Sequence, residues 1–176
     1  MKKILGILGT ITLIGTSTTS LVACNSNTPQ EKEYTTEELT KLKEKNKINT
    51  DNQEIKNNLE WMVPQEKPFN EVDNKYYFVV WKGKTEWYIT KFLNNEKINQ
   101  HGRKVLKEED GYEIGLYRYS NFKYEVDLFN YEPSKMTNWP WRIDKGTYFK
   151  SVYRWNGDEQ NLPDLVVNND GNIKVN

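Results

Sequence analysis

Apolar side chains follow three different patterns along the chain. From residue 4 to residue 14 they form a nearly continuous run, broken only by glycine and threonine. Between residues 39 and 62 they recur at helical spacing, as in Ile55, Leu59 and Met62. From residue 75 onward they become aromatic and β-branched and are separated by short polar turns, which is typical of strands. The pattern therefore predicts an apolar leader, a helical segment and a strand-rich domain.

Two short helices are expected before the strands. Thr35 and Glu38 have the spacing of a capping box, in which each side chain bonds the backbone of the other residue. The helix that they begin extends to Ile48, and its thin apolar face predicts that it is mostly solvated. A second helix is expected over residues 52–62, with its apolar stripe on the main domain, and Pro64 ends it.

The rest of the chain is expected to form a small antiparallel fold. Strands are predicted over 76–81, 86–93, 110–119, 122–128 and 147–155, with a terminal hairpin at 165–167 and 173–175. In the fourth of these, Phe122, Tyr124, Val126 and Leu128 alternate with Lys123, Glu125 and Asp127, which predicts one buried and one solvated face. Residues 94–109 are polar and are expected to be irregular, and Trp139-Pro140-Trp141 indicates an irregular or edge segment. The fold class is therefore mainly β (α+β): a small antiparallel β-sandwich or partly open barrel preceded by one or two N-terminal helices.

The apolar leader has the features of a lipoprotein signal peptide. A basic start, Lys2-Lys3, precedes an apolar run of about eleven residues, which is shorter than the ~20 needed to cross a bilayer. It ends in Leu21-Val22-Ala23-Cys24, the lipobox pattern, in which the thiol receives a diacylglyceryl group and cleavage follows a small residue. We therefore predict cleavage between Ala23 and Cys24 and lipid attachment at Cys24; the alternatives are an ordinary secretory signal or an uncleaved anchor.

These observations predict the organisation of the whole chain. The expected parts are a signal peptide (1–23), a flexible tether (24–34), a helical stem (35–63) and a β-rich domain (70–176). Two acyl chains on Cys24 supply a firm anchor, because each buried methylene adds about 0.8 kcal/mol. The predicted location is the extracellular face of the cell membrane.

Composition narrows the classes of partner. The chain has 176 residues with 25 basic and 25 acidic side chains; removal of Lys2 and Lys3 leaves 25 − 2 = 23 basic ones, a net charge of −2. A near-neutral body has no strong field to attract phosphate backbones, so no nucleic-acid partner is expected. Cys24 is the only cysteine, so we expect no disulfide in the mature fold.

Catalytic and metal-binding motifs are not apparent, but aromatic residues are abundant. One histidine, His101, is too few for a transition-metal site, and we predict no metal, no catalytic residue and no cofactor beyond the covalent lipid. The chain has 6 Trp, 11 Tyr and 6 Phe, most of which must form the core. The candidate exposed binding aromatics are Trp139, Trp141 and Trp155.

The chain resembles surface lipoproteins of mollicutes, especially the spiroplasma type. The resemblance rests on the start from Met1 to Leu5 with Leu21-Val22-Ala23-Cys24, on Asn74-Lys75-Tyr76-Tyr77, and on residues 151–155, 162–165 and 172–176 near the end. It implies a plasma-membrane lipoprotein exposed directly to the host, and it implies no known activity. Only Cys24 carries over as a functional residue.

Three functions are compatible with these features. The first is a non-enzymatic binding or adhesion module that contacts a host protein or glycan, or a surface coat, with aromatic residues supplying contact area. The second is a glycan-binding or glycan-hydrolysing extracellular domain, which would place two carboxylates about 5–10 Å apart beneath exposed tryptophans. A transporter's ligand-capturing subunit is disfavoured, because 176 − 23 = 153 residues is short for two lobes.

Overall fold

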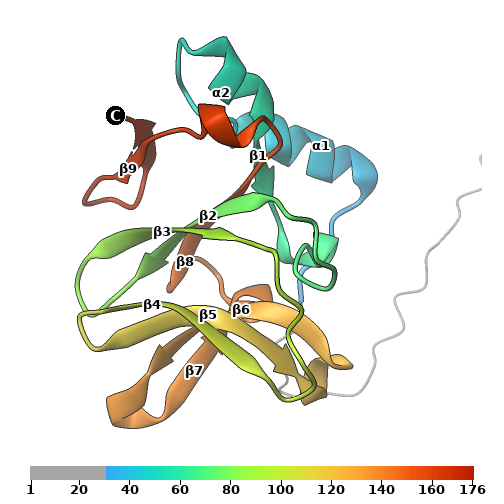
Figure 1. Cartoon of the computed structure of the whole chain (residues 1–176), viewed down its shortest axis with the longest axis vertical. Coiled ribbons are helices and arrows are strands. Elements are labelled where there is room, and N and C mark those ends of the chain that lie inside the picture. Colours follow the sequence, from blue (N-terminus) through green and yellow to red (C-terminus); the bar gives the residue numbers. More distant parts are fainter. Residues whose placement is uncertain (1–30) are drawn as a thin grey trace, which may run out of the picture.

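The computed structural model describes residues 31–176, which fold as two packed β-sheets with helices and a hairpin on one side (Figure 1). Sheet A contains, in spatial order, β1 (Leu59–Met62), β8 (Phe149–Trp155), β2 (Tyr76–Lys82) and β3 (Trp87–Leu93). Sheet B contains, in spatial order, β4 (Arg103–Glu109), β5 (Tyr112–Tyr119), β6 (Glu125–Glu132) and β7 (Thr137–Pro140). Every pair of neighbouring strands is antiparallel. The prediction of a mainly β, sandwich-like α+β fold is confirmed, and the sheets form no closed barrel.

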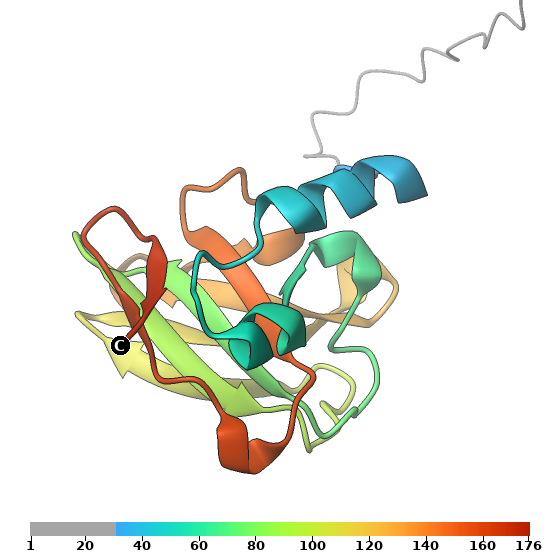
Figure 2. The ribbon, with the colours of Figure 1, turned by 90° about the horizontal axis from the view of Figure 1, so that it is seen from above.

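The two α-helices and the last hairpin lie over the outer face of sheet A (Figure 2). The helical elements are α1 (Thr36–Lys45), α2 (Gln53–Asn58) and the short 3-10 helices η1 (Pro64–Glu66), η2 (Ser120–Phe122), η3 (Pro133–Lys135), η4 (Trp141–Ile143) and η5 (Glu159–Asn161). The hairpin is formed by β9 (Leu165–Val167) and β10 (Ile173–Val175). None of the helices within residues 31–176 is long and apolar enough to cross a membrane.

Sheet A has a hydrophobic core on each of its faces. The core between the sheets includes Val79 and Trp81 of β2, Val152 of β8, Ile114 of β5 and Leu128 of β6. The second core joins the outer face of sheet A to the helices and the hairpin and includes Phe78, Tyr153, Trp155, Ile55 and Leu165. Strand β2 lies between two other strands and is covered on both faces, which explains its continuous run of apolar residues.

Local signals in the sequence set several boundaries. Thr35 caps α1 in the predicted capping box, with its Oγ1 accepting from the N–H of Glu38 and the Glu38 carboxylate accepting from the N–H of Thr35. Asn52 caps α2 by accepting from the N–H of Ile55. The hairpin between β4 and β5 turns at Asp110 and Gly111, which both have positive φ.

Three predicted elements differ from the structure. The helix expected over 52–62 ends at Asn58, because residues 59–62 pair with β8 as strand β1. Leu59 and Met62 then lie in different cores, although helical spacing would place them on one face. Part of the stretch expected to be irregular, 94–109, forms the polar edge strand β4.

The third difference concerns the start of β6. The strand was expected to begin at Phe122, but it begins at Glu125. Phe122 belongs to η2, and Lys123 and Tyr124 both have positive φ, which interrupts the extended backbone. From Glu125 onward the side chains alternate between the two faces as predicted, but the second face is not solvated: Asp127 is 2% exposed and is paired with Arg142.

Candidate functional site

The outer face of sheet B carries a shallow hollow lined by aromatic and polar side chains. It has a volume of about 220 Å³ and is lined by Arg103, Tyr117, Phe129, Tyr131 and Asn138. These residues come from all four strands and share one side of the sheet, because their registers pair Tyr117 with Arg103 and Tyr131 with Asn138. The opposite side of β5 and β6 faces the core between the sheets. We call this feature the aromatic hollow.

The floor of the aromatic hollow depends on a glycine in β5. Gly115 pairs with Phe129 in β6, and a Cβ on Gly115 would lie 2.6 Å from two carbons of the Phe129 ring. The same Cβ would lie 2.3 Å from the carbonyl oxygen of Lys104 in β4. Only a glycine therefore allows the phenyl ring to lie this close to the backbone of β5.

Arg103 lies at the edge of the hollow and stacks on two of its rings. Its guanidinium carbon lies 5.5 Å from the centre of the Tyr131 ring and 5.8 Å from the centre of the Phe129 ring. The guanidinium also donates to the carboxylate of Glu113, with an N–O distance of 2.7 Å. The planar group is thus oriented by one acid and two rings, while nearly half of the side chain stays exposed.

Tyr119 contacts two residues that line the hollow, Tyr117 and Asn138. Its ring packs edge-to-face on Tyr117 with 4.6 Å between the centroids, and its hydroxyl donates to the side-chain oxygen of Asn138 over 3.3 Å. Burial, together with the nearby charge of Asp127, raises the pKa of the Tyr119 hydroxyl, so this group stays a hydrogen-bond donor. The amide of Asn138 is exposed at the rim.

A buried ion pair holds the first residues of β6 next to Tyr117 and Tyr119. Asp127 accepts from the backbone N–H of Arg142 over 2.9 Å and from its Nε over 3.2 Å. Arg142 also donates to Glu125 over 2.9 Å and lies over the Phe122 ring. Burial raises the pKa of Asp127 to about 6 although Arg142 acts against the rise. This carboxylate is enclosed, and one of its oxygens accepts two hydrogen bonds from Arg142, so it holds η4 on β6.

The aromatic residues singled out in the sequence lie apart from one another. Trp139, in β7, is half-buried and stacks on Tyr148 with 3.9 Å between the centroids and 19° between the planes. Trp141 is 7% exposed and packs in the core against Phe69. Trp155 is 1% exposed in the second core, and its indole N–H donates to the carbonyl of Asp158. The prediction of an exposed platform is therefore wrong for Trp141 and Trp155, which are both buried. The structure also does not bring the three tryptophans together.

No family model, no curated protein and no solved structure matches the chain. The resemblance to mollicute surface lipoproteins stays a prediction. Cys24 and Ala23, on which that resemblance partly rests, lie outside the described residues.

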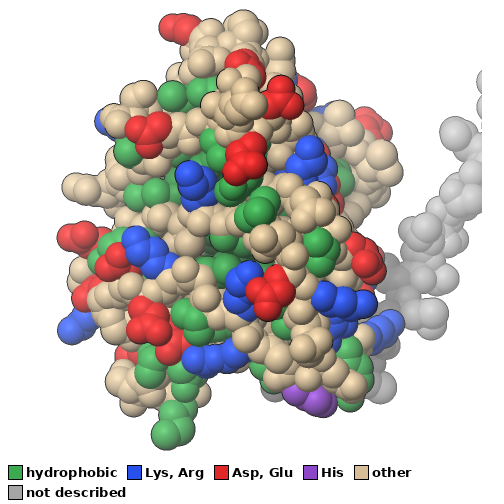
Figure 3. Space-filling model, viewed as in Figure 1, with side chains coloured by type: hydrophobic (Ala, Val, Ile, Leu, Met, Phe, Trp, Pro, Cys, Tyr) green, Lys and Arg blue, Asp and Glu red, His purple; other side chains and the backbone are tan. Residues whose placement is uncertain are grey.

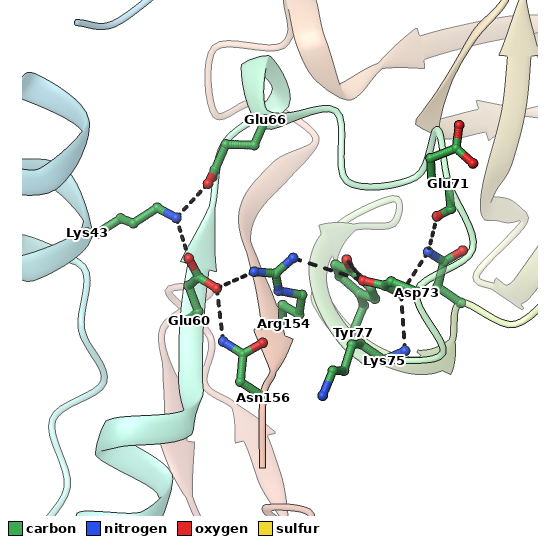
Figure 4. Close-up of polar contacts among 10 residues, drawn as sticks. Lys43, Glu60, Glu66, Glu71, Asp73, Lys75, Tyr77, Arg154 and Asn156 are labelled. Atoms are coloured by element: carbon green, nitrogen blue, oxygen red, sulfur yellow. Dashed lines mark hydrogen bonds and ion pairs between the residues drawn. The ribbon is translucent and has the colours of Figure 1, made fainter. Parts of the chain in front are cut away.

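Other carboxylates form a polar network that holds α1 on the sandwich (Figure 4). Glu60 of β1 accepts from Lys43 of α1, from Arg154 of β8 over 2.7 Å and from Asn156 over 2.9 Å. Lys43 also pairs with Glu66 of η1. Burial acts to raise the pKa of Glu60, but these donors outweigh it and lower the pKa to about 2. Glu60 is thus a fixed anion rather than a proton donor at neutral pH.

The same network continues to Asp73. Its carboxylate accepts from the Tyr77 hydroxyl over 2.7 Å and from the Asn94 side chain over 3.0 Å, and it lies 4.0 Å from the guanidinium of Arg154 (Figure 4). The described residues contain no group of three or more side chains arranged to hold a metal ion. The donors to Glu60 and Asp73 come from several elements, so these carboxylates help to hold the elements together.

The residues of the aromatic hollow had one signal in the sequence. The alternation that begins at Glu125 and Asp127 continues with Phe129 and Tyr131, so the face expected to be solvated becomes aromatic halfway along β6. Tyr117 and Tyr119 show the same change along β5. The register between β5 and β6 places these four residues on one face and pairs Phe129 with Gly115 and Tyr117 with Asp127, which no local pattern reveals.

Proposed function

We propose that this chain is a lipid-anchored protein of the outer cell surface whose sandwich is a non-enzymatic binding module. The ligand that we propose for the aromatic hollow is a host glycan. The observation that carries the proposal is the combination of half-buried tyrosine rings with exposed hydrogen-bonding groups of Arg103 and Asn138 in one small hollow. Sugar rings have apolar C–H faces that pack on aromatic rings, and hydroxyl groups that bond with guanidinium and amide groups.

The size of the hollow favours a sugar over a protein partner. Its volume of about 220 Å³ lies below the ≈ 300–1,000 Å³ typical of sites for drug-sized molecules, so it suits one ring at a time. A stable protein interface covers roughly 800 Å² on each partner, far more than this hollow offers. Tyrosine and arginine are also common at the centres of protein interfaces, which makes a host protein the second candidate.

Binding is favoured over glycan hydrolysis by the chemistry of the hollow. The residues that line it include no carboxylate, and the neighbouring Glu113 is paired with Arg103. A hydrolase needs one carboxylic acid and one free carboxylate on opposite sides of the scissile bond. The arrangement is suited to holding a sugar rather than to cleaving it.

The surface location is supported by the leader and by the charge of the chain. The lipobox at residues 21–24 supplies the proposed anchor. Acidic and basic side chains are mixed on the face of the molecule shown in Figure 3, without a large area of one sign. Such a surface does not attract nucleic acid over a distance, so the recognition of a ligand depends on short-range contacts in the binding site.

The proposal is tested by applying the intact lipoprotein, in detergent micelles, to an array of host-type glycans. We expect binding to a subset of them and a loss of about tenfold or more when Tyr117→Ala and Tyr131→Ala are combined, because two stacking contacts are removed. Tyr124→Ala is the matched control, since Tyr124 is an exposed tyrosine outside the hollow. Equal losses in both variants, or binding to no glycan, would contradict the proposal.

A further inference from the structure

A second cavity lies at an edge of the sandwich, beside the core between the sheets, where the chain enters the fold. It has a volume of about 440 Å³ and lies between the entering segment 32–34, β1 with the start of η1, and the segment 141–152. Tyr34 is held there by Gln65, whose side chain accepts from the Tyr34 N–H over 2.7 Å and donates to its carbonyl over 2.9 Å. We call it the entry cavity.

The walls of the entry cavity are mostly apolar. They include Trp61, Met62, Pro64, Trp141, Ile143 and Phe149. Met62, Trp141 and Phe149 belong to the core between the sheets, so the walls are fixed by the packing of the sandwich. A cavity of this volume falls within the range that holds small ligands, and its walls favour a hydrocarbon group.

The charged side chains around the entry cavity are mainly basic. Lys32, Lys145 and Lys150 line it, and none of these lysines forms an ion pair within residues 31–176. Lys150 lies over the ring of Trp87, at 5.9 Å, and Trp87 is not part of the lining. Lys32 lies over the ring of Tyr34, at 4.7 Å, and Tyr34 lines the cavity, so Lys32 and Lys145 are the ammonium groups best suited to a ligand there.

The other two charged residues of the lining are already engaged. Asp144 accepts from the backbone N–H groups of Gly146, Tyr148 and Phe149, so its charge is used to hold the loop that carries Lys145. Arg142 is paired with Glu125 and Asp127. The Glu31 carboxylate also acts on Arg142 and helps to raise its pKa. The charged lining residues left for a ligand are the lysines, so the charge that the lining offers is positive.

The position of Lys32 in the sequence relates the entry cavity to the membrane. Lys32 follows Cys24 by 32 − 24 = 8 residues. Even a fully extended chain of eight residues spans at most about 29 Å, so the cavity of an anchored molecule lies within about 30 Å of the bilayer surface. This step rests on the lipid anchor of the proposed function.

We infer that the entry cavity binds a single-chain anionic amphiphile, such as a fatty acid, taken from the membrane to which the protein is anchored. The hydrocarbon chain packs between Trp61 and the wall formed by Trp141 and Phe149, and the acid group lies between Lys32 and Lys145. Both lysines are exposed, so the acid group can remain partly hydrated while the chain is buried.

The inference is tested with the intact lipoprotein in phosphatidylcholine vesicles that contain a trace of a photoreactive fatty acid. After illumination, mass spectrometry identifies the labelled peptides. We expect label on the segments around residues 61–64 and 141–152, and about tenfold less label when Lys32→Glu and Lys145→Glu are combined. The matched control combines Lys84→Glu and Lys174→Glu, which make the same charge change at exposed lysines outside the cavity.

Two further measurements separate the possible failures. A photoreactive alcohol of the same chain length should label the cavity weakly in all variants; equal labelling by alcohol and acid would overturn the role of the lysines. The full chain with Cys24→Ser, mixed with the fatty acid without vesicles, should still be labelled in the cavity. Label there but not in the anchored protein would contradict the membrane as the source, and no label in either sample would overturn the site itself. Neither result bears on glycan binding by the aromatic hollow.

Discussion

Phe129 lies against Gly115 of the neighbouring strand, and this contact forms the floor of the aromatic hollow. Gly115→Ala would place a methyl group 2.6 Å from the phenyl ring and 2.3 Å from the carbonyl oxygen of Lys104. Because the backbone oxygen cannot move away without disturbing the pairing of β4 and β5, we expect a loss of about 1–3 kcal/mol in the free energy of unfolding. Urea denaturation measures this loss, and an unchanged midpoint would contradict the described packing.

Arg103→Lys tests whether the planar group of the arginine matters. Lysine keeps the positive charge beside Glu113 but cannot stack on Tyr131 and Phe129 in the same way. We expect glycan binding to weaken several-fold while thermal stability changes little, because the side chain is exposed at the rim. Binding measured on immobilised glycan checks this, and wild-type affinity in the lysine variant would show that charge alone is sufficient.

The buried pair of Asp127 and Arg142 gives a prediction about stability. Arg142→Met leaves Asp127 without its cation in a site where it is 2% exposed, so we expect a loss of about 3–5 kcal/mol. Adding Asp127→Asn to this variant removes the uncompensated charge and should restore a large part of the loss. Denaturation of the two single variants and the double variant forms the cycle, and simple additivity of the losses would be evidence against coupling.

Glu60 predicts how stability depends on pH. Its pKa is about 2 in the folded protein against 4.5 for an unperturbed glutamate, so the unfolded chain binds the extra proton first as the pH falls. The contribution of Glu60 to stability is therefore complete above pH 4.5 and is lost between pH 4.5 and 2, by about 3 kcal/mol at most.

The comparison with Glu60→Gln isolates this effect. Asp127 acts in the opposite direction between pH 6 and 3.8, since its folded pKa is raised to about 6, but it is the same in both proteins. Urea denaturation at several pH values should show a shallower acid loss in Glu60→Gln than in wild type, whereas Glu108→Gln, on the exposed edge strand, should match wild type. Parallel curves for Glu60→Gln and wild type would show that Lys43 and Arg154 do not hold this carboxylate.

Cys24→Ser tests the proposed anchor. The serine hydroxyl does not accept the diacylglyceryl group, so we expect a protein that is neither lipidated nor processed. Mass spectrometry of the amino-terminal peptide and partition into detergent measure the two effects. A mature, detergent-phase protein of unchanged size in this variant would overturn the assignment of residues 21–24 as a lipobox.

The sequence predicted those elements whose causes are local. Thr35 with Glu38, Asn52 and the aromatic run of β2 each act through neighbouring residues, and these features were recognised from the pattern alone. Strand β1 was missed because its spacing is also helical; its strand conformation comes from pairing with β8, almost 100 residues later. The intrinsic secondary-structure propensity of a segment predicts its conformation poorly where the segment can form hydrogen bonds with a strand far away in the sequence.

The candidate site was harder to predict because it depends on which aromatic rings are covered. Trp155 ends a strand and precedes a turn, which suggests exposure, but α2 and the terminal hairpin cover that face of sheet A. Tyr117 and Tyr131 look like core residues in the sequence, yet the outer face of sheet B leaves both of them half-buried. Whether a ring is covered depends on the packing of elements that are far apart in the sequence. The sequence alone therefore offered one indication of the site, which is the change from acidic to aromatic residues along one face of β6.

The most direct test of the account is carbene footprinting of the intact lipoprotein on vesicles, with and without the glycan that gives the strongest array signal. The account predicts that the glycan lowers labelling on β5, β6 and the Asn138 peptide, and leaves the entry cavity unchanged. Protection confined to other surfaces, or no protection at a saturating glycan concentration, would contradict the assignment of the aromatic hollow as the binding site.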